Sequence, residues 1–563
     1  MIILGLSALD TDATAMLFMD NRIVGAIAEE RLTRKKLQNG FPRKALRKLL
    51  DDHGVTPTDI DVVAYPFFDW QQEGALISKH YAENLAYTAT NDEPIDRKLN
   101  HTAHFSKWAA QAILDHRHYT HELHENLREL GLLEKLVRVD HHTAHAASAY
   151  YCSGYDRALV ITLDWYGGGL AGMVGKASPE GIEVLKQFKY PHSLGLFYAQ
   201  VTSALGFKPT RHEGKIVGLA SFGEPQILFD QVYGRFEVLS GDYRYKAGMD
   251  MTFCKKLAQK YDREDIAAAY QAVLERVVTL VANHYVRREG LDAIVLAGGV
   301  TANVKMNQRL FEIEGVRRIF IHPNMGDGGT GTGAAILVAS QRTDLEPWRL
   351  HDVYFGPEYS EKEIEVALQR ERVEYTKPAE IEAEVAALIH SGRVVAHFDG
   401  RMEYGPRALG NRSILYHTVD PTVNDWLNKR LKRTEFMPFA PATLWETRHD
   451  CFYDMGEAEL PAEYMTITFD CKPQMKHQSP AAVHVDGTAR PQLVREDVNP
   501  RFYKIIKEYE KLSGIPSIVN TSFNMHEEPI VCSPRDAIRA FNLGNLDYLA
   551  IGPFLCKGQF TQD

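Results

Sequence analysis

The chain has 563 residues, of which 45% are hydrophobic and 25% are charged. This composition is typical of globular proteins and excludes collagen-like, coiled-coil and wholly disordered chains. The 64 Lys and Arg residues against 74 Asp and Glu residues give a net charge of −10, which argues against a large nucleic-acid-binding surface.

The N-terminal sequence MIILGLS lacks a basic region before its apolar run, so no secretory signal is visible. No apolar stretch approaches the ~20 residues of a membrane-spanning helix. The six cysteines are scattered and include no CxxC pair. We therefore expect a cytoplasmic protein with reduced thiols and no membrane segment.

A pattern of three short apolar runs separated by turn residues occurs twice and predicts two β-meanders. The runs are residues 1–5, 15–19 and 23–28 in the first copy, and 158–163, 171–175 and 182–188 in the second. In the second copy Asp164 and three glycines follow the first run. A duplicated meander with helices after each copy is typical of actin-like nucleotide-binding domains. Two unrelated hairpins are the alternative.

Further along the chain, residues 270–288 have helical periodicity and residues 293–296 and 319–322 read as buried strands. Each strand leads into a glycine-containing loop, which lets the backbone approach a ligand, although glycine is also common in ordinary turns. The pattern breaks at a polar stretch near residue 350. Helices at 360–370 and 381–390 and a strand at 393–398 follow. The expected fold is mixed α/β, with domains at 1–350 and 351–563.

Two histidines and two aspartates form the first candidate site. His141 and His145 are four residues apart, so on one helix they face the same side and can bind one metal ion. Asp164 and Asp327 lie in glycine-containing loops, and carboxylates with imidazoles suit Fe, Mn or Zn. Helix-terminal or core histidines are the alternative, because sequence distance does not show that the four residues converge.

The second candidate is the loop 400–413, which has three arginines interleaved with glycines. Guanidinium groups bind phosphate in bidentate fashion, so the loop suits phosphate recognition better than a solvated basic surface. Lys429, Arg430, Lys432 and Arg433 follow, and some of them are expected to be surface charges. The third candidate is the turn 520–524, which either holds a small amide or nucleotide or is a simple Asn/Ser turn.

Together these motifs resemble the nodulation-type and antibiotic O-carbamoyltransferases over nearly the whole chain. The matching stretches are HHTAHAASAYYCSG (141–154), GKIVGLASFG (214–223), AGGVTANVKMN (297–307), GDGGTGTGAA (326–335), GRMEYGPRALGNRS (400–413), DGTARPQLV (486–494) and NTSFNMHEEPIV (520–531).

The resemblance implies two modules. A C-terminal YrdC-like α/β domain would make carbamoyl-adenylate from ATP and carbamoyl phosphate. An N-terminal Kae1-like domain of the actin-like (ASKHA) class would transfer the carbamoyl group to a hydroxyl or amine of a small-molecule acceptor in specialised metabolism. The implied partners are ATP, carbamoyl phosphate and this acceptor. A homodimer is one option, and neither nucleic acid nor a membrane is expected.

The resemblance also assigns residues. His141, His145, Asp164 and Asp327 match the metal ligands, with Fe²⁺ or another divalent transition metal as cofactor and Mg²⁺ accompanying ATP. The residues that match nucleotide and carbamoyl phosphate positions are Gly298, Gly299, Asn303, Arg407, Lys432, Arg490, Asn520, Thr521, Ser522 and Asn524. Asp12, Arg407 and Lys432 are the expected catalytic residues.

The chain departs from the family pattern at three positions. Thr11 replaces the histidine that follows the first strand, Met437 replaces an arginine before Pro-Phe-Ala-Pro, and His526 replaces the arginine of an Arg-Gly-Glu-Pro stretch. We therefore expect Asp12, and not a histidine, to act as the base or to orient the acceptor.

Three other functions remain as alternatives. The same two modules serve threonylcarbamoyl transfer to transfer RNA, but the acidic balance argues against it. An ATP-binding regulatory protein that has lost the chemistry, or has only a weakened activity, would explain the departures. An actin-like sugar kinase would not explain the C-terminal region.

Overall fold

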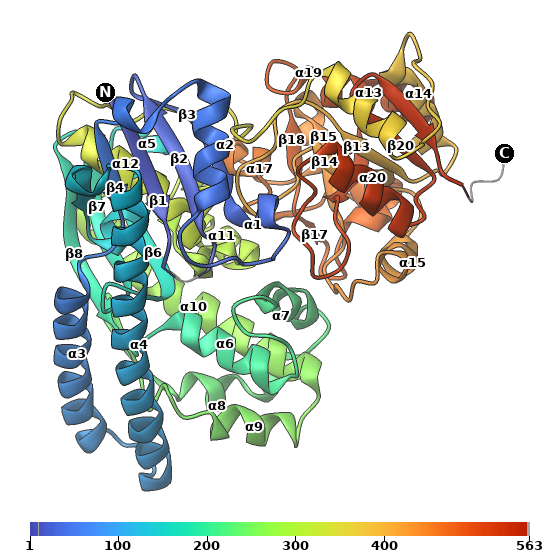
Figure 1. Ribbon diagram of the computed structural model, residues 1–563. Helices are drawn as coiled ribbons and strands as arrows, with labels where there is room; N and C mark the ends of the chain where they lie inside the picture. Colours follow the sequence, from blue (N-terminus) through green and yellow to red (C-terminus); the bar gives the residue numbers. More distant parts are fainter. Residues whose placement is uncertain (10, 560–563) are drawn as a thin grey trace. The chain divides into compact units, whose positions relative to one another are not determined.

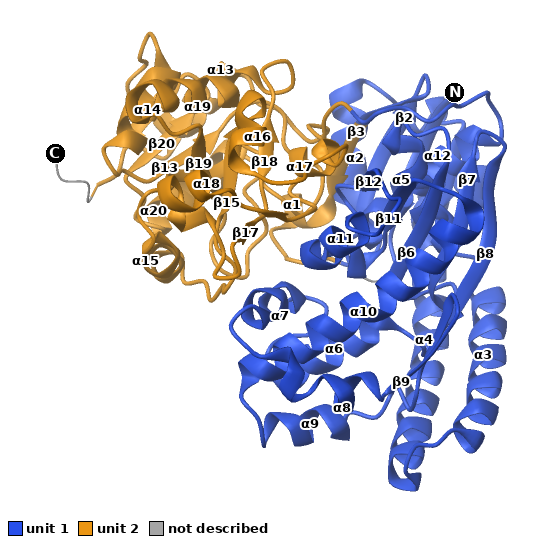
Figure 2. Ribbon diagram, turned by 180° about the vertical axis from the view of Figure 1, so that it is seen from behind, with its two compact units in different colours: residues 1–24, 39–350 blue, residues 25–38, 351–563 orange. Residues whose placement is uncertain are grey.

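The computed structural model describes residues 1–9 and 11–559, which form two compact units (Figure 2). Unit 1 comprises residues 1–24 and 39–350, and unit 2 comprises residues 25–38 and 351–563. This division differs from the expected domain ranges in one segment, 25–38. The segment belongs to unit 2 because it hydrogen-bonds there, for example from Ala26 N to Phe355 O at 3.1 Å.

The first sheet of unit 1 has the strand order β3-β2-β1-β4-β5. Its strands are β1 (Ile2–Ser7), β2 (Thr14–Met19), β3 (Arg22–Ala28), β4 (Val62–Tyr65) and β5 (Leu136–Arg138). Strand β1 is antiparallel to β2 and parallel to β4, and β4 is parallel to β5. Helices α2 (Arg43–His53), α3 (Trp70–Thr90) and α4 (Ile95–Glu129) lie between its strands in the sequence.

The second sheet repeats this arrangement, with the order β8-β7-β6-β11-β12. Its strands are β6 (Ala158–Gly167), β7 (Leu170–Ser178), β8 (Gly181–Lys189), β11 (Ala293–Ala297) and β12 (Arg318–Ile321). Strand β6 is antiparallel to β7 and parallel to β11, and β11 is parallel to β12. The two sheets therefore have the same topology, and the predicted duplication of the actin-like fold is confirmed.

Two central helices occupy equivalent positions in the two copies. Helix α5 (His141–Ser153) follows β5, and α12 (Thr330–Ser340) follows β12. Glycine allows them to pack closely, because a Cβ atom at Gly333 would lie 1.8 Å from the carbonyl oxygen of Ala144. A Cβ atom at Gly5 would lie 2.2 Å from the oxygen of Gly331, so α12 also lies directly on β1.

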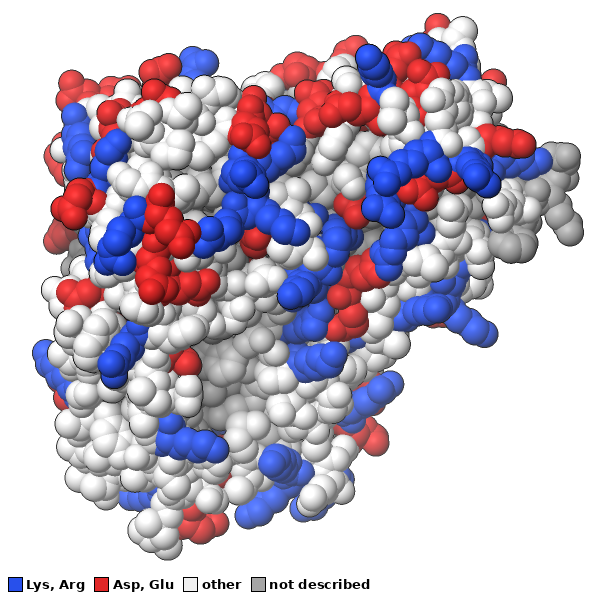
Figure 3. All heavy atoms as spheres, in the orientation of Figure 1, with Lys and Arg blue, Asp and Glu red and all other residues white. Residues whose placement is uncertain are grey.

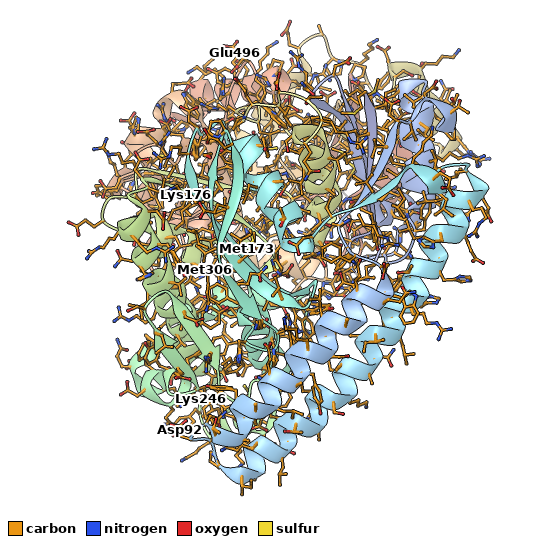
Figure 4. All side chains as sticks on the ribbon, turned by 90° about the vertical axis from the view of Figure 1, so that its left-hand side faces the viewer. Asp92, Met173, Lys176, Lys246, Met306 and Glu496 are labelled. Atoms are coloured by element: carbon orange, nitrogen blue, oxygen red, sulfur yellow. The ribbon has the colours of Figure 1, made fainter. Side chains whose placement is uncertain are left out.

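The long hairpin of α3 and α4 between β4 and β5 was not predicted from the sequence (Figure 1). Asp92, in the turn of this hairpin, forms an ion pair of 2.9 Å with Lys246 (Figure 4). The remaining elements of unit 1 surround α10 (Arg263–Glu289), which includes the predicted helix 270–288. They are α6 (Leu194–Ala204), α7 (Glu213–Ala220), α8 (Phe229–Tyr233), β9 (Phe236–Leu239), β10 (Asp242–Tyr245), α9 (Thr252–Ala258) and α11 (Val304–Phe311).

Unit 2 is built on a seven-stranded sheet with the order β18-β15-β19-β14-β13-β20-β21. The strands are β13 (Val395–Phe398), β14 (Arg412–His417), β15 (Ala440–Leu444), β18 (Gln492–Val494), β19 (Ser517–Ser522), β20 (Tyr548–Ile551) and β21 (Phe554–Lys557). Its main helices are α1 (Glu29–Thr33), α13 (Glu361–Arg370), α14 (Ile381–His390), α15 (Val423–Arg430), α19 (Pro500–Ser513) and α20 (Pro534–Leu543). Two separate hydrophobic clusters cover the sheet, since Ile414 packs in one and its neighbour Leu415 in the other.

None of the helices in the described part of the chain is long and apolar enough to cross a membrane. On the face shown in Figure 3, Lys and Arg side chains are interspersed with Asp and Glu side chains. All six cysteines are buried and in the thiol form.

Candidate metal centre and anion site

Two imidazoles and two carboxylates converge in unit 1. His141 and His145 come from the first two turns of α5, Asp164 from the end region of β6, and Asp327 from the turn that precedes α12. One nitrogen or oxygen of each residue lies within 4.8 Å of those of the other three. The duplicated fold causes this convergence, because α5 and α12 begin at equivalent points of the two copies.

The contacts within this His/Asp cluster use one atom of each side chain. Nε2 of His145 lies 3.1 Å from Oδ2 of Asp164 and 3.5 Å from Oδ1 of Asp327. Nε2 of His141 lies 3.6 Å and 3.7 Å from the same two oxygens. The two imidazoles are fully buried. Two nitrogen and two oxygen donors that point at one another are a set that suits Fe, Mn or Zn.

The electrostatics of the cluster favour an ionised carboxylate. Burial alone would raise the pKa of Asp164, but the neighbouring imidazoles of His141 and His145 hold that pKa well below its ordinary value. Nε2 of His141, which lies beyond hydrogen-bond distance of both aspartates, is buried and has no hydrogen-bond partner among the described residues. Most buried polar atoms do have such partners, so this nitrogen fits one that is held by a metal ion.

Glycine makes room around the cluster. A Cβ atom at Gly167 would lie 2.0 Å from Cδ2 of His141, and one at Gly299 would lie 3.1 Å from Oδ1 of Asp164. The ring of Phe67 also packs against His141, with 4.6 Å between the ring centroids. The imidazole of His141 is therefore held in contact with both a phenyl ring and a backbone that lacks a side chain.

Asp12 is a further residue that the sequence singled out, and it lies beside the turn that carries Asp327. It has a left-handed φ of 61°, and its Cβ is 3.2 Å from the position that a Cβ on Gly328 would take. Gly328 directly follows Asp327. The loop after β1 therefore brings the Cβ atom of Asp12 close to the turn that carries Asp327.

Two other predicted residues of unit 1 have structural contacts. Gly298 has a φ of 97°, and a Cβ there would lie 2.2 Å from the oxygen of Leu163, so the glycine is needed for packing between strands. The amide of Asn303 caps α11 through Met306 N at 3.0 Å and also forms two hydrogen bonds with Gln271. Of the three predicted residues Gly298, Gly299 and Asn303, Gly299 is the one that lies beside the His/Asp cluster.

In unit 2 two half-buried arginines, Arg407 and Arg490, form a second candidate site. Burial lowers the pKa of both Arg407 and Arg490, and the charge of Arg407 lowers that of Arg490 further, while Glu435 offsets part of the effect. Nε of each arginine is buried and makes no hydrogen bond within the described chain. Two desolvated like charges are costly unless an anion compensates them. The Arg407/Arg490 pair therefore suits a phosphate.

The other arginines of the loop 400–413 hold the fold. Arg401 donates from Nη2 to Phe355 O at 2.9 Å. Arg412 is buried, donates to four carbonyl oxygens and lies 3.7 Å above the centroid of the Phe398 ring. The carboxylate of Glu403 accepts from the backbone N–H groups of residues 409, 411 and 412. The loop is thus rigid, and it leaves Arg407 for a ligand.

Two asparagines of the predicted turn 520–524 have different roles. Nδ2 of Asn520 donates to Ala408 O and to Gln492 Oε1, and its buried Oδ1 has no partner in the described structure. Asn524 closes the turn, because its Nδ2 donates to Met525 O and Glu528 O and its Oδ1 accepts from Ser522. Asn520 therefore faces the loop that carries Arg407, whereas Asn524 shapes the backbone.

Lys432 is exposed, whereas its neighbour Arg433 contacts the turn 520–524. Lys432 has a φ of 58°, which turns the chain so that Arg433 points inward. Arg433 donates to Thr521 Oγ1 at 3.1 Å and to Asn524 Oδ1 at 2.8 Å, and burial lowers its pKa to about 10. Some residues of this basic run were expected to be surface charges, and the backbone turn at Lys432 selects Arg433 as the side chain that points inward.

A duplicated sheet with equivalent helices that meet at a His/Asp cluster defines unit 1 as an actin-like domain, here combined with a second α/β unit. The chain belongs to the carbamoyltransferase family. Residues 2–336 match the model of the carbamoyltransferase N-terminus, and residues 386–557 match the model of the carbamoyltransferase C-terminus. The resemblance seen in the sequence is confirmed, and the protein is an enzyme of the transferase class.

Several curated proteins are similar over nearly the whole chain. An uncharacterized protein of Synechocystis is 33% identical over 98% of this chain and 96% of its own length. The nodulation protein NolNO of Sinorhizobium fredii is 31% identical over 97% of this chain and 79% of its own length. Nodulation protein U of Rhizobium tropici is 27% identical over 96% of this chain and 93% of its own length. Among solved structures, HypF of T. kodakarensis has 15% identity and a TM-score of 0.33 over 61% of this chain and 49% of its own.

Proposed function

We propose that unit 2 makes carbamoyl-adenylate from ATP and carbamoyl phosphate and that unit 1 transfers the carbamoyl group to a small-molecule hydroxyl or amine, as in specialised metabolism. The observation that carries this proposal is the Arg407/Arg490 pair, whose buried, unpartnered Nε atoms and partly desolvated charges suit a phosphate. Membership of the carbamoyltransferase family supports it.

In unit 2 the two guanidinium groups would bind phosphate oxygens of carbamoyl phosphate and ATP, the latter accompanied by Mg²⁺. The free Oδ1 of Asn520 is an acceptor suited to the amino group of the carbamoyl unit. Carbamoyl phosphate, ATP and one water molecule would then give carbamoyl-adenylate, phosphate and pyrophosphate.

In unit 1 His141, His145, Asp164 and Asp327 would hold the metal ion, with Fe²⁺ as the expected ion. Such an ion supplies a Lewis acid that polarises a carbonyl group. Asp12 would accept the proton of the acceptor hydroxyl or orient that group, since Thr11 offers no imidazole. The acceptor oxygen then bonds to the carbamoyl carbon, and AMP leaves.

The test is incubation of the full chain with ATP, Mg²⁺ and carbamoyl phosphate, followed by mass spectrometry for carbamoyl-adenylate and an assay for pyrophosphate. Arg407→Ala should abolish both products. Arg535→Ala is the matched control, because that arginine of unit 2 is 72% exposed. Wild-type protein that forms neither product would show that the proposal is wrong and would favour a non-catalytic ATP-binding role.

A further inference from the structure

The segment 25–38 comes from the early part of the chain and contacts the backbone near the candidate anion site of unit 2. It contains the short helix α1, in which Glu29, Glu30 and Arg31 are buried. It binds other parts of unit 2 at three separate places: from Ala26 N to Phe355 O, from Arg31 to Gly405 and from Arg34 to residues 529 and 530. Gly405 lies in the loop that carries Arg407, and residues 529 and 530 follow the turn 520–524.

Arg31 holds the loop that carries Arg407. Its side chain is 8% exposed, and Nη1 lies 3.2 Å from Oε1 of Glu30. Nη2 donates to the carbonyl oxygen of Gly405 at 2.9 Å. Gly405 has a φ of 121°, a conformation that few other residues adopt, and it lies two residues before Arg407. The hydrogen bond from Arg31 thus fixes the backbone at the bend that aims Arg407.

Arg34 holds the turn that begins at Asn520. It donates from Nη1 to Ile530 O at 2.7 Å and from Nη2 to Pro529 O at 2.6 Å. Those residues close the turn, because Val531 N donates to Phe523 O at 2.9 Å and Asn524 Nδ2 donates to Glu528 O at 2.8 Å. One guanidinium group therefore fixes two successive carbonyls of the irregular segment that closes the turn.

The segment is braced internally, so the two arginines are held in place. The second carboxylate oxygen of Glu30 accepts from Leu37 N at 2.8 Å, and Glu30 O accepts from Arg34 N at 2.9 Å. Arg34 and Leu37 both have left-handed φ values, of 61° and 55°. Such backbone conformations persist where surrounding contacts enforce them.

From these contacts we infer that Arg31 and Arg34 are positioning residues for the adenylate-forming site of unit 2. They bind backbone carbonyls and not substrate, and they act by fixing the loops of Arg407 and Asn520. The inference rests on the proposed function, because it assigns these residues to the same phosphate site.

The experiment uses full-length Arg31→Ala and Arg34→Ala, with Lys35→Ala as the control. Lys35 lies in the same segment, carries the same charge and is exposed. Amide hydrogen exchange should rise at 403–412 in Arg31→Ala and at 520–531 in Arg34→Ala. The Kd for ATP and the KM for carbamoyl phosphate should each rise by about tenfold, as expected for loss of a charge-assisted hydrogen bond. Transfer from pre-formed carbamoyl-adenylate should stay at the wild-type rate.

Conservative variants separate positioning from folding. Arg31→Lys and Arg34→Lys keep the charge and one donor, so they should recover part of the affinity; they replace the alanine variants if those do not fold. Faster exchange in the loops with wild-type ATP affinity and KM would overturn the inference, and so would unchanged exchange. If the wild type binds ATP but releases no pyrophosphate, the proposed function fails and the affinities of the variants decide the inference. If it binds neither ATP nor carbamoyl phosphate, both fail.

Discussion

The imidazole of His141 leaves space only for glycine at position 167, because a Cβ atom there would lie 2.0 Å from Cδ2 of the ring. We therefore predict that Gly167→Ala displaces His141 and weakens metal binding by about 10- to 100-fold, the usual effect of disturbing a ligand's support. Metal content after dialysis is the measurement. Gly214→Ala is the control, since nothing lies within 4 Å of a Cβ at that position. Full metal content in Gly167→Ala would contradict the arrangement.

The ligand assignment itself is tested at the histidines. Protein purified without chelator should contain about one transition metal ion per chain, and His141→Ala or His145→Ala should lose it. His142→Ala should retain the metal, because Nδ1 of His142 is engaged with Thr162 Oγ1 at 2.9 Å, although loss of that contact should lower the melting temperature. Undiminished metal in both ligand variants would exclude the site.

Stability should fall between pH 6.5 and 8 because of Glu73. Burial raises the pKa of Glu73 to about 8, whereas burial lowers the pKa of His116, 3.9 Å away, to about 4. Across this window the folded state keeps the Glu73 proton that the unfolded state has lost, so the free energy of unfolding decreases as pH rises. Below about pH 6.5 the histidine acts in the opposite direction, since the unfolded state then binds its proton.

Urea unfolding at pH 6.5 and 8 measures this effect. Glu73→Gln removes the titrating group and should reduce the difference between the two pH values by on the order of 1–2 kcal/mol. Glu129→Gln is the control on the neighbouring helix, because that side chain is 63% exposed. An equal pH dependence in wild type and Glu73→Gln would show that Glu73 does not carry the proton.

Arg433 should matter more than Lys432 for adenylate formation. Arg433→Ala removes hydrogen bonds to Thr521 and Asn524 and should reduce pyrophosphate release at least about tenfold, in line with the loss of charged hydrogen bonds. Lys432→Ala should cause a smaller loss, since its side chain is exposed. A larger loss of pyrophosphate release in Lys432→Ala than in Arg433→Ala would show that Lys432 is the more important residue.

Transfer should depend on Asp12. A general base typically contributes ~10²- to 10⁴-fold, so Asp12→Asn should slow single-turnover transfer from pre-formed adenylate by that order while metal content is unchanged. Thr11→His tests whether a histidine in this loop adds to the rate. If Asp12→Asn has the wild-type rate and Thr11→His is faster, Asp12 is not the base.

The sequence predicted those parts of the molecule that depend on local pattern. The two β-meanders follow from the alternation of apolar runs and turns, and the helix 270–288 follows from its helical periodicity. The i, i+4 spacing selected His141 and His145. The convergence of these histidines with Asp164 and Asp327 follows from the duplicated sheet, which local pattern alone does not fix.

What the sequence left open depends on contacts between distant residues. The hairpin of α3 and α4 was missed because many of its residues are polar and its helices lack a strong apolar stripe. Arg433 was not singled out from Lys432 because a single positive φ decides which of them points inward. The placement of 25–38 in unit 2 likewise depends on hydrogen bonds to residues hundreds of positions away.

The interrupted course of unit 2 sets an order for its assembly during synthesis. Residues 25–38 leave the ribosome early, but their partners at 355, 405 and 530 come only after the stretch 39–350 has been translated. At about 5–20 residues per second that interval lasts roughly 15–60 s, during which Glu29, Glu30 and Arg31 lack their final environment. Unit 1 can fold in this time, whereas unit 2 must wait for the last part of the chain. The nascent protein thus completes its proposed adenylate-forming site last.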